Sequence, residues 1–161
     1  MIRRAAHADA QGIINSHIRS IREICSKDYS PQEIEAWAGR DFKVERWHAT
    51  IDRDFVWVID IGGKVSGFGH IALKDDGSAY LHGLYFSPEA KGLGFGKKLF
   101  EEMLKVVREK KISKIRLHST ITAKAFYKHL GFQESEGECG IDMQGIRVPC
   151  FPMELKIIPE R

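Results

Sequence analysis

At 161 residues, the chain can bury one substantial core, and its length gives no reason to expect a second domain. We therefore expect one domain over residues 1–161, with the composition of an ordinary globular protein (43% apolar and 29% charged residues). The net charge of +3 is small and spread along the chain, which argues against a nucleic acid or another polyanion as the partner.

The start of the chain and the cysteines indicate a compartment. No apolar run follows the first few residues, so the sequence predicts no signal peptide and no contact with a membrane. Cys25, Cys139 and Cys150 are an odd number without CxxC spacing, and no His/Cys pattern matches a metal site. We expect a cytoplasmic protein with reduced thiols and no bound metal.

The first third of the chain predicts a short strand at residues 2–5 and then two helices. Residues 9–26 carry an apolar helical face. Ser30-Pro31-Gln32-Glu33 has the pattern of a capping box with proline at the first helical position, which predicts a second helix through Trp37 that ends near Gly39. The face of the first helix consists of Ile13, Ile14, His17, Ile18, Ile21 and Ile24.

The rest of the chain alternates between strand and helix patterns. Residues 55–60 and 64–73 are β-rich runs joined by Gly62-Gly63, which predicts a hairpin, and residues 79–86 predict the next strand. A long helix follows, then a strand at 114–119, a short helix, and two terminal strands at 133–139 and 148–157 around a 140–147 connection. This order predicts an α/β protein in which helices cover both faces of a mixed sheet. The buried stripe of the long helix is Leu99, Phe100, Met103, Leu104 and Val107.

Residues 80–99 contain the most informative motif. A β-rich run and a Ser-Pro turn lead to Gly92, Gly94 and Gly96, which open the long helix. Such a loop leaves backbone N–H groups free at the positive end of the helix dipole, and this suits a phosphate or pyrophosphate. Glycine matters there because a Cβ would hold the anion away from the amides.

Two common phosphate-binding loops do not fit this motif. A nucleoside-triphosphate P-loop needs four residues between its glycines and then Lys followed by Ser or Thr. Here Gly92 and Gly96 enclose three residues, and Lys97 is followed by Lys98. A dinucleotide-binding fold would place an acidic residue about 20 positions later, and the strand at 114–119 has none.

A second motif lies downstream, in a predicted short helix that Thr122 caps and Gly131 ends. Its residues Ala123, Phe126, Tyr127, Gly131 and Phe132 match the Ala-x-x-Phe-Tyr-x-x-x-Gly-Phe signature of the GCN5-related N-acetyltransferase family. Together with the glycine loop, which matches the pyrophosphate loop of that family, it makes the chain resemble a small bacterial-type member. The resemblance covers nearly the whole chain and implies a mostly antiparallel sheet of about seven strands.

The resemblance implies acetyl-CoA as the co-substrate. In the family, the backbone of the strand before the loop splays from its neighbour, hydrogen-bonds the pantetheine arm and helps to polarise the thioester. Lys91 stands where the family usually has Gln or Arg, and Thr120 replaces an asparagine that often contacts pantetheine. The expected cofactor-binding residues are Leu84, Tyr85, Phe86, Lys91, Gly92, Leu93, Gly94, Phe95, Gly96, Lys97, Thr120, Ala123 and Phe126.

For catalysis, the resemblance assigns Tyr127 as the acid that protonates the departing thiolate, which a phenol with a pKa near 10 can do. Many relatives use a glutamate near the strand at 79–86 as the base, but this strand contains no acid. His82 is the best-placed titratable group, on the face that Leu84 would share. His118 and His70 are alternatives. For Glu33 and Glu35 a solvated face of the second helix is favoured, and the alternative is an acceptor pocket that attracts a cationic amine.

We expect an N-acetyltransferase that moves acetyl directly from acetyl-CoA to a primary amine of a small molecule. The family often forms dimers, so a homodimer is an open possibility. Two other functions stay open: an acyl-CoA sensor that has lost turnover, supported by the missing acid, and a protein acetyltransferase acting on lysine or an N-terminus. The latter would show an open groove in place of a closed pocket.

Overall fold

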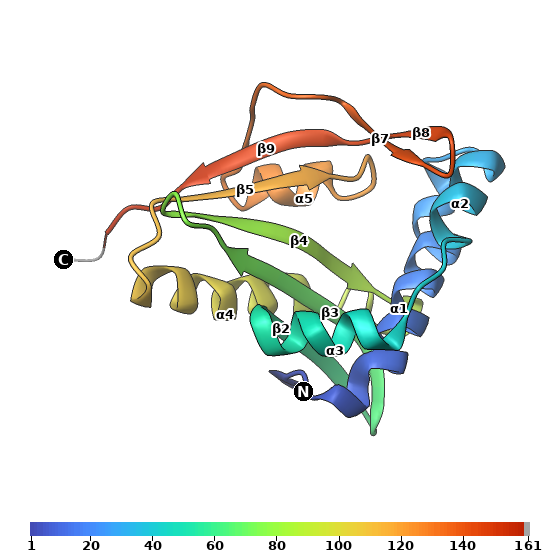
Figure 1. Cartoon of the computed structure of the whole chain (residues 1–161), viewed down its shortest axis with the longest axis horizontal. Helices are drawn as coiled ribbons and strands as arrows, with labels where there is room; N and C mark the ends of the chain where they lie inside the picture. The colour runs from blue at the N-terminus through green and yellow to red at the C-terminus, as the bar shows by residue number, and fades with distance from the viewer. Residues whose placement is uncertain (160–161) are drawn as a thin grey trace.

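The computed structural model describes residues 1–159 and is built around a seven-stranded sheet in the order β1-β2-β3-β4-β5-β9-β6 (Figure 1). Every neighbouring pair is antiparallel except β4 and β5, which are parallel, so the mixed, mostly antiparallel sheet is confirmed. The strands are β1 (Ile2–Arg4), β2 (Phe55–Ile61), β3 (Lys64–Leu73), β4 (Ser78–Phe86), β5 (Lys114–Ser119), β9 (Phe151–Lys156) and β6 (Gln133–Glu134).

The parallel pair β4 and β5 separates along its length. Their ladder joins Ser78–Leu81 to Lys114–Leu117 only, although β4 continues to Phe86. Beyond the ladder the two strands diverge, as Figure 1 shows. The second half of β4 therefore pairs with β3 on one edge and leaves the N–H and C=O groups of its other edge outside the ladder.

A β-bulge lies where the two strands begin to separate. Ile71 of β3 pairs with Leu81, but His70 pairs with Gly83, so His82 is an extra residue on β4. As a result, Leu84 packs in the core beneath α4 while His82 lies on the opposite face, stacked on His70. The prediction that His82 and Leu84 share a face is wrong because the extra residue breaks the alternation.

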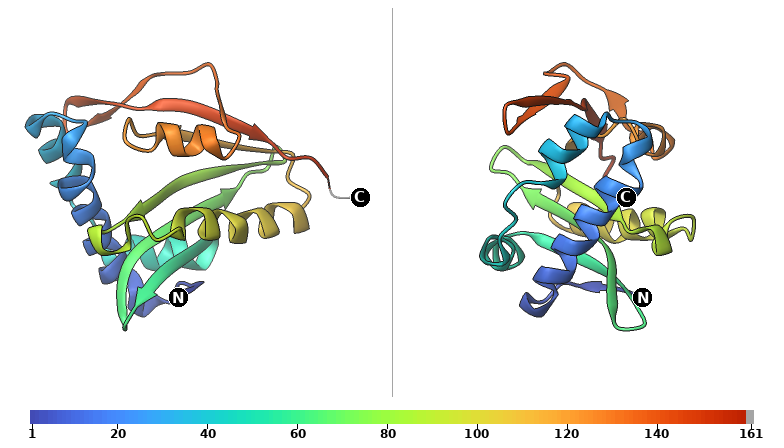
Figure 2. Two further views of the ribbon diagram at one scale, coloured as in Figure 1. Left: turned by 180° about the vertical axis from the view of Figure 1, so that it is seen from behind. Right: turned by 90° about the vertical axis from the view of Figure 1, so that its right-hand side faces the viewer.

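One face of the sheet carries α4 (Phe95–Glu109) and α5 (Lys124–His129). The reverse view in Figure 2 has α4 in front of the strands. The predicted stripe of α4 is confirmed: Leu99, Phe100, Met103 and Val107 are buried against the sheet, and Leu104 is partly buried.

The other face carries α1 (Ala10–Glu23), α2 (Pro31–Ala38) and α3 (Val44–Arg53). Short 3-10 turns, His7–Asp9 and Cys25–Lys27, flank α1, which makes it shorter than predicted. The capping box of α2 is confirmed, since the Glu33 N–H donates to Ser30 Oγ at 3.1 Å and Gly39 ends the helix. Helix α3 was not predicted, because none of its residues is fully buried and no side chain caps it.

The C-terminal region differs from the prediction in part. The predicted strand at 133–139 is only the two-residue β6, and the predicted strand at 148–157 is divided between β8 (Ile146–Pro149) and β9. The predicted 140–147 connection instead contributes to a separate hairpin of β7 (Gly140–Met143) and β8. This hairpin packs against α2 at the splayed end of the sheet (Figure 1).

Candidate active site

The glycine loop forms the start of α4. Gly92 and Gly94 adopt left-handed φ angles of +77° and +79°, and no side chain caps the helix at Phe95. Within the described chain, the backbone N–H groups of residues 92–97 make no hydrogen bond. The loop therefore presents a run of free donors at the positive end of a helix, together with the Lys97 side chain.

Gly96 has a different role from its neighbours. A Cβ at this position would lie 2.9 Å from the Phe126 ring, whereas nothing lies within 4 Å of a Cβ at Gly92 or Gly94. Gly96 thus lets α4 and α5 approach each other, while the other two glycines supply the backbone conformation.

A cavity of about 280 Å³, here called the α5 cavity, lies between β4, α5 and the end of α1. Seven of the predicted cofactor-binding residues line it: Leu84, Tyr85, Phe86, Lys91, Thr120, Ala123 and Phe126. The predicted residues Gly92, Leu93, Gly94, Phe95, Gly96 and Lys97 form the adjoining loop and first turn of α4. The structure thus brings the two sequence motifs to one side of the splayed strands.

The residues before α5 differ from the sequence prediction. Thr122 does not cap the helix, because its hydroxyl donates to Asp28 Oδ2 at 2.8 Å. The Thr120 hydroxyl instead accepts a hydrogen bond from the Ala123 N–H at 3.0 Å. Gly131 does end the helix, with a φ of +104°.

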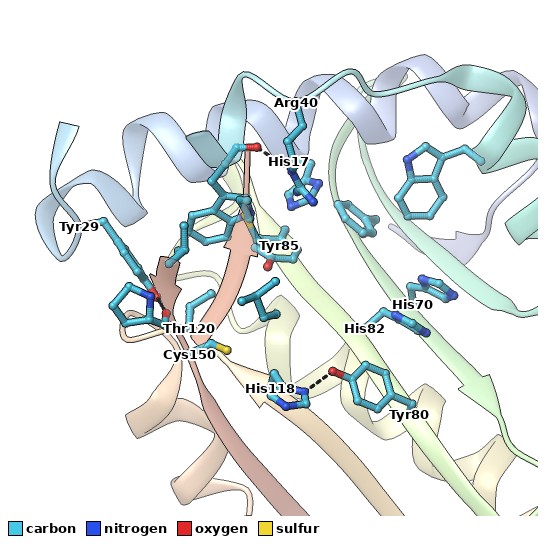
Figure 3. A pocket seen from close by; sticks show the side chains of 17 residues that line it. His17, Tyr29, Arg40, His70, Tyr80, His82, Tyr85, His118, Thr120 and Cys150 are labelled. Carbon is cyan, nitrogen blue, oxygen red and sulfur yellow. Dashed lines mark hydrogen bonds between the residues drawn. The ribbon is translucent and has the colours of Figure 1, made fainter. Parts of the chain in front are cut away.

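On the opposite face lies a second cavity of about 290 Å³, here called the aromatic cavity (Figure 3). Its wall is assembled from α1, the segments around α2, α3, three strands and the β7–β8 hairpin, which are far apart in the sequence. The residues lining it are His17, Tyr29, Trp37, Arg40, Trp47, Phe68, His70, Tyr80, His82, Tyr85, His118, Thr120, Ile141, Met143, Val148, Pro149 and Cys150.

The Tyr29 hydroxyl holds two parts of this wall together. It donates to the Pro149 carbonyl at 2.7 Å and accepts from the Ile121 N–H at 2.9 Å. One side chain from the loop before α2 therefore joins the hairpin segment to the segment that leads into α5.

The two cavities meet at the splay. A narrow space between β4 and β5 is lined by His82 and Leu84 from β4, His118 from β5, and Tyr127 from α5. Tyr127 is buried, with only 4% of its surface exposed, and its hydroxyl makes no hydrogen bond within the described residues. Burial raises the pKa of this phenol, so it keeps its proton at neutral pH.

A family model described as "Acetyltransferase (GNAT) domain" matches residues 25–157. The chain belongs to the GNAT family. It is an acetyl-CoA-dependent N-acetyltransferase, and the resemblance inferred from its sequence is confirmed.

Three known proteins illustrate this relationship. The uncharacterized N-acetyltransferase YafP of Escherichia coli is 31% identical over 132 residues, which cover 82% of this chain and 80% of YafP. A GCN5-related N-acetyltransferase from Rhodopseudomonas palustris shares the fold with a TM-score of 0.86 and 19% identity, covering 98% of this chain and 95% of that one. PaiA N-acetyltransferase from Thermoplasma acidophilum, solved with coenzyme A, superposes with a TM-score of 0.79 at 24% identity and 98% coverage of both chains. Among residues 1–159, no helix has the length and apolar character needed to cross a bilayer.

In this GNAT acetyltransferase, His82 belongs to a group with His70 and Asp54. The His70 Nε2 atom lies 2.8 Å from Asp54 Oδ2, and the rings of His70 and His82 stack with centroids 4.3 Å apart. Burial, followed by the charge of His70, lowers the pKa of His82 to about 4, so its imidazole is neutral at pH 7. His82 also makes no hydrogen bond within residues 1–159 and keeps an exposed edge.

The same three side chains are the candidate metal ligands of the described chain, with ligand atoms within 4.8 Å of one another. Their arrangement does not suit one ion, because imidazole lone pairs lie in the ring plane and the two planes are nearly parallel, at 12°. The Nε2 atom of His70 is already engaged, because its N–H donates a hydrogen bond to the Asp54 carboxylate. The two rings therefore do not direct their lone pairs toward one point.

Of the other predicted candidates, His118 and His70 both reach the aromatic cavity, where the Nδ1 atom of His118 is hydrogen-bonded to the Tyr80 hydroxyl (Figure 3). Glu33 and Glu35 do not line it. Glu33 caps α2, and Glu35 pairs with Arg22 at 2.9 Å on the surface. The solvated helix face, which the sequence favours for both acids, is confirmed, because the capping box and an ion pair hold both side chains outside the cavity.

Sequence reasoning missed much of the aromatic cavity. Trp37 and Trp47 line it, whereas Trp57 is in the core beneath α4. Arg40 and His17 also line it, although the sequence marks His17 only as part of an apolar helix face and does not mark Arg40. No local pattern marks either residue, since each becomes part of a site only through the tertiary arrangement.

Proposed function

We propose that this enzyme transfers the acetyl group of acetyl-CoA directly to the primary amine of a small molecule. One observation carries the proposal: two cavities on opposite sides of the splayed strands meet where Tyr127 and His82 lie. A direct transfer needs a donor and an acceptor that approach one point from two sides, and holding them in line accounts for a large part of such catalysis.

The donor side suits a pyrophosphate with an attached arm. The N–H groups of residues 92–97 offer charge-assisted hydrogen bonds to phosphate oxygens, and Gly92 and Gly94 keep Cβ atoms away from them. Lys91 and Lys97 add positive charge without the planar fork of an arginine. The α5 cavity then gives the arm a path to the splay, where the free edge of Leu84–Phe86 can bond it.

Acetyl-CoA supplies an activated thioester. The acceptor nitrogen forms a bond to the carbonyl carbon as the carbon–sulfur bond breaks, the nitrogen loses a proton, and the sulfur gains one. Tyr127 donates that proton, because its buried hydroxyl is protonated at neutral pH and has no acceptor within the described chain. The backbone of β4 beyond the bulge stabilises charge on the carbonyl oxygen.

His82 receives the proton from the acceptor nitrogen. It is neutral at pH 7, exposed to the aromatic cavity and free of hydrogen bonds within residues 1–159, unlike His118 and His70. With a pKa of about 4 it is a weak base, so it acts on an amine that already binds in its neutral form or on a proton passed through water. Asp54 orients His70, whose ring supports that of His82.

The aromatic cavity supports a small acceptor. Its volume of about 290 Å³ is near the lower end of the range, roughly 300–1,000 Å³, that is common for small-molecule sites. Helices α1–α3 and the β7–β8 hairpin surround it, which favours a pocket over the open groove of a protein acetyltransferase. The three unpaired cysteines fit a reducing compartment such as the cytoplasm.

The test is acetyl-CoA binding by calorimetry, followed by free-thiol release from the same preparation across a panel of amines. We expect binding, together with thiol release that depends on a small primary amine. Binding without release from any small amine, but with release from a peptide, would replace this proposal by a protein acetyltransferase. Binding without release from either would indicate a sensor.

A further inference from the structure

Arg40 is a cation without a counterion at the aromatic cavity. It lies between α2 and α3, and Figure 3 shows its side chain reaching into the cavity beside His17. Its Nε atom donates to the Trp37 carbonyl at 2.9 Å, and the guanidinium lies 4.9 Å from the centre of the Phe42 ring. Within residues 1–159, its two Nη groups have no hydrogen-bond acceptor and no carboxylate within 4.0 Å.

Most arginines elsewhere in the described chain are placed differently. Arg3, Arg19, Arg22 and Arg53 each pair with a carboxylate. Arg40 is half-buried, and burial lowers its pKa, as expected for a cation that is partly removed from water without an anion beside it. Such an arrangement is costly unless an anion completes it.

The cavity wall offers no competing acid. Among the described residues that line it, none is Asp or Glu, while four are histidines and one is Arg40. His17 beside it is 91% buried, and both of its ring nitrogens lack a hydrogen-bond partner. Burial, followed by the charge of Arg40, lowers the pKa of this histidine to about 3, so it is neutral and offers one donor and one acceptor. A polycationic amine would find no negative charge in this cavity.

The rest of the wall is apolar. Trp37, Trp47, Phe68 and Tyr85 present aromatic surfaces, and Met143 and Val148 add aliphatic ones from the hairpin. Aromatic walls of this kind bind apolar or aromatic bodies, while a guanidinium matches the geometry of a carboxylate with two parallel hydrogen bonds.

We propose that the acceptor is an amine that also carries a carboxylate on an apolar or aromatic body, and that Arg40 binds this carboxylate. The acetylation of the amine rests on the proposed function, whereas the binding of the carboxylate rests only on the geometry around Arg40. The carboxylate fixes the acceptor at the α2 side of the cavity and leaves its amine to reach the splay.

The first test compares matched acceptors that differ only in the carboxylate: phenylalanine with 2-phenylethylamine, and 4-(aminomethyl)benzoate with benzylamine. In the wild type we expect the carboxylate to raise kcat/KM in at least one pair. In Arg40→Gln this preference, the ratio of kcat/KM with and without the carboxylate, should fall by about 10- to 100-fold, the usual range for one charge-assisted pair. Arg40→Lys should retain part of the preference.

The matched control is Arg46→Gln, which removes the same charge from an exposed position on α3 outside the cavity wall. It should keep the wild-type preference. An unchanged preference in Arg40→Gln, or a preference for amines without a carboxylate in the wild type, would overturn the proposal.

A second test needs no turnover. 3-Phenylpropanoate has the carboxylate but no amine, and its binding can be followed by the fluorescence of Trp37 and Trp47. We expect the wild type and Arg46→Gln to bind it, and Arg40→Gln to bind it at least about 10-fold more weakly. No binding to the wild type, or equal binding to Arg40→Gln, would refute the carboxylate site. Carboxylate binding that depends on Arg40, without acetyl transfer to any amine, would refute the proposed function and leave this site intact.

Discussion

The two sides of the splayed sheet are built in different ways. On the α5 side, the groups offered to a ligand are mostly backbone: the N–H groups of residues 92–97 and the free edge of β4 beyond Leu81. On the aromatic side, they are side chains from α1, the segments around α2, α3 and the hairpin. A backbone site depends on conformation and is recognisable as a local motif, whereas a side-chain site can change its chemistry one residue at a time.

A substitution at the point where the two sides meet should have the largest effect on activity. Tyr127→Phe removes the hydroxyl that we assign as the acid and keeps the ring that packs against Phe126 and Phe132. We expect kcat to fall about 100-fold with little change in the Kd of acetyl-CoA, measured by steady-state kinetics and calorimetry. An unaltered kcat would remove Tyr127 from the chemistry without touching the fold.

The second-largest effect is expected for a substitution that changes the backbone on the α5 side. Gly94 has a φ of +79°, which alanine adopts at a cost of roughly 1–2 kcal/mol. We expect Gly94→Ala to weaken acetyl-CoA binding about 10- to 30-fold in calorimetry, because the loop must either strain or move its N–H groups.

The control for this change is Gly77→Ala. Gly77 has a φ of +83° in the turn between β3 and β4, with nothing within 4 Å of an added Cβ. Gly94→Ala and Gly77→Ala should lower the melting temperature by similar amounts, but Gly77→Ala should leave the Kd of acetyl-CoA unchanged. If both variants bound acetyl-CoA as the wild type does, the pyrophosphate would not rest on this loop.

On the aromatic side, His82→Gln should lower kcat/KM about 10-fold, a modest loss because an imidazole with a pKa of about 4 is a weak base. The rise of activity toward alkaline pH should persist in the variant, since it reports deprotonation of the acceptor amine. His129→Gln, at the exposed end of α5, is the control and should match the wild type. Equal pH–rate profiles and equal rates for all three proteins would eliminate His82 as the base.

His17→Phe should have the smallest effect at neutral pH and a clear one in acid. The pKa of His17 is about 3 in the folded protein against 6.5 when exposed, so the unfolded chain binds a proton that the folded one does not. This group therefore stabilises the fold fully above pH 6.5, and its contribution falls by about 1.4 kcal/mol for each pH unit below that, down to about pH 3.

Urea unfolding at pH 7 and pH 4.5 measures this difference. The wild type should lose about 2 kcal/mol more of its unfolding free energy than His17→Phe between the two pH values. Equal losses of unfolding free energy in the two proteins would contradict a lowered pKa for His17 and would mean that the folded protein can protonate this side chain.

The two sides also differ in how well the sequence predicts them. The glycine loop, the α5 signature and the stripe of α4 are local patterns, so the family, the sheet and Tyr127 could be inferred from them. Arg40 and Asp54 carry no such pattern. Asp54 meets His70 only when β2 pairs with β3, and Arg40 lies beside His17 in the cavity wall only when the segment after α2 folds back toward α1. The solvated position of Glu33 and Glu35 could be predicted, since local capping and pairing use both acids before any cavity can.

The extra residue in β4 has a consequence for how this strand tolerates change. Before His82, the odd-numbered residues Ala79 and Leu81 face α4; after it, the even-numbered Leu84 and Phe86 do. The side chains alternate regularly on each side of His82, but the two parts of the strand are offset by one residue. Substitutions alter one side chain at a time, whereas deleting His82 would make Ile71–Leu81 and His70–Gly83 consecutive regular pairs and would leave Leu84 facing α4. The bulge is therefore the point at which this strand can lose one residue and keep the side-chain order on both faces.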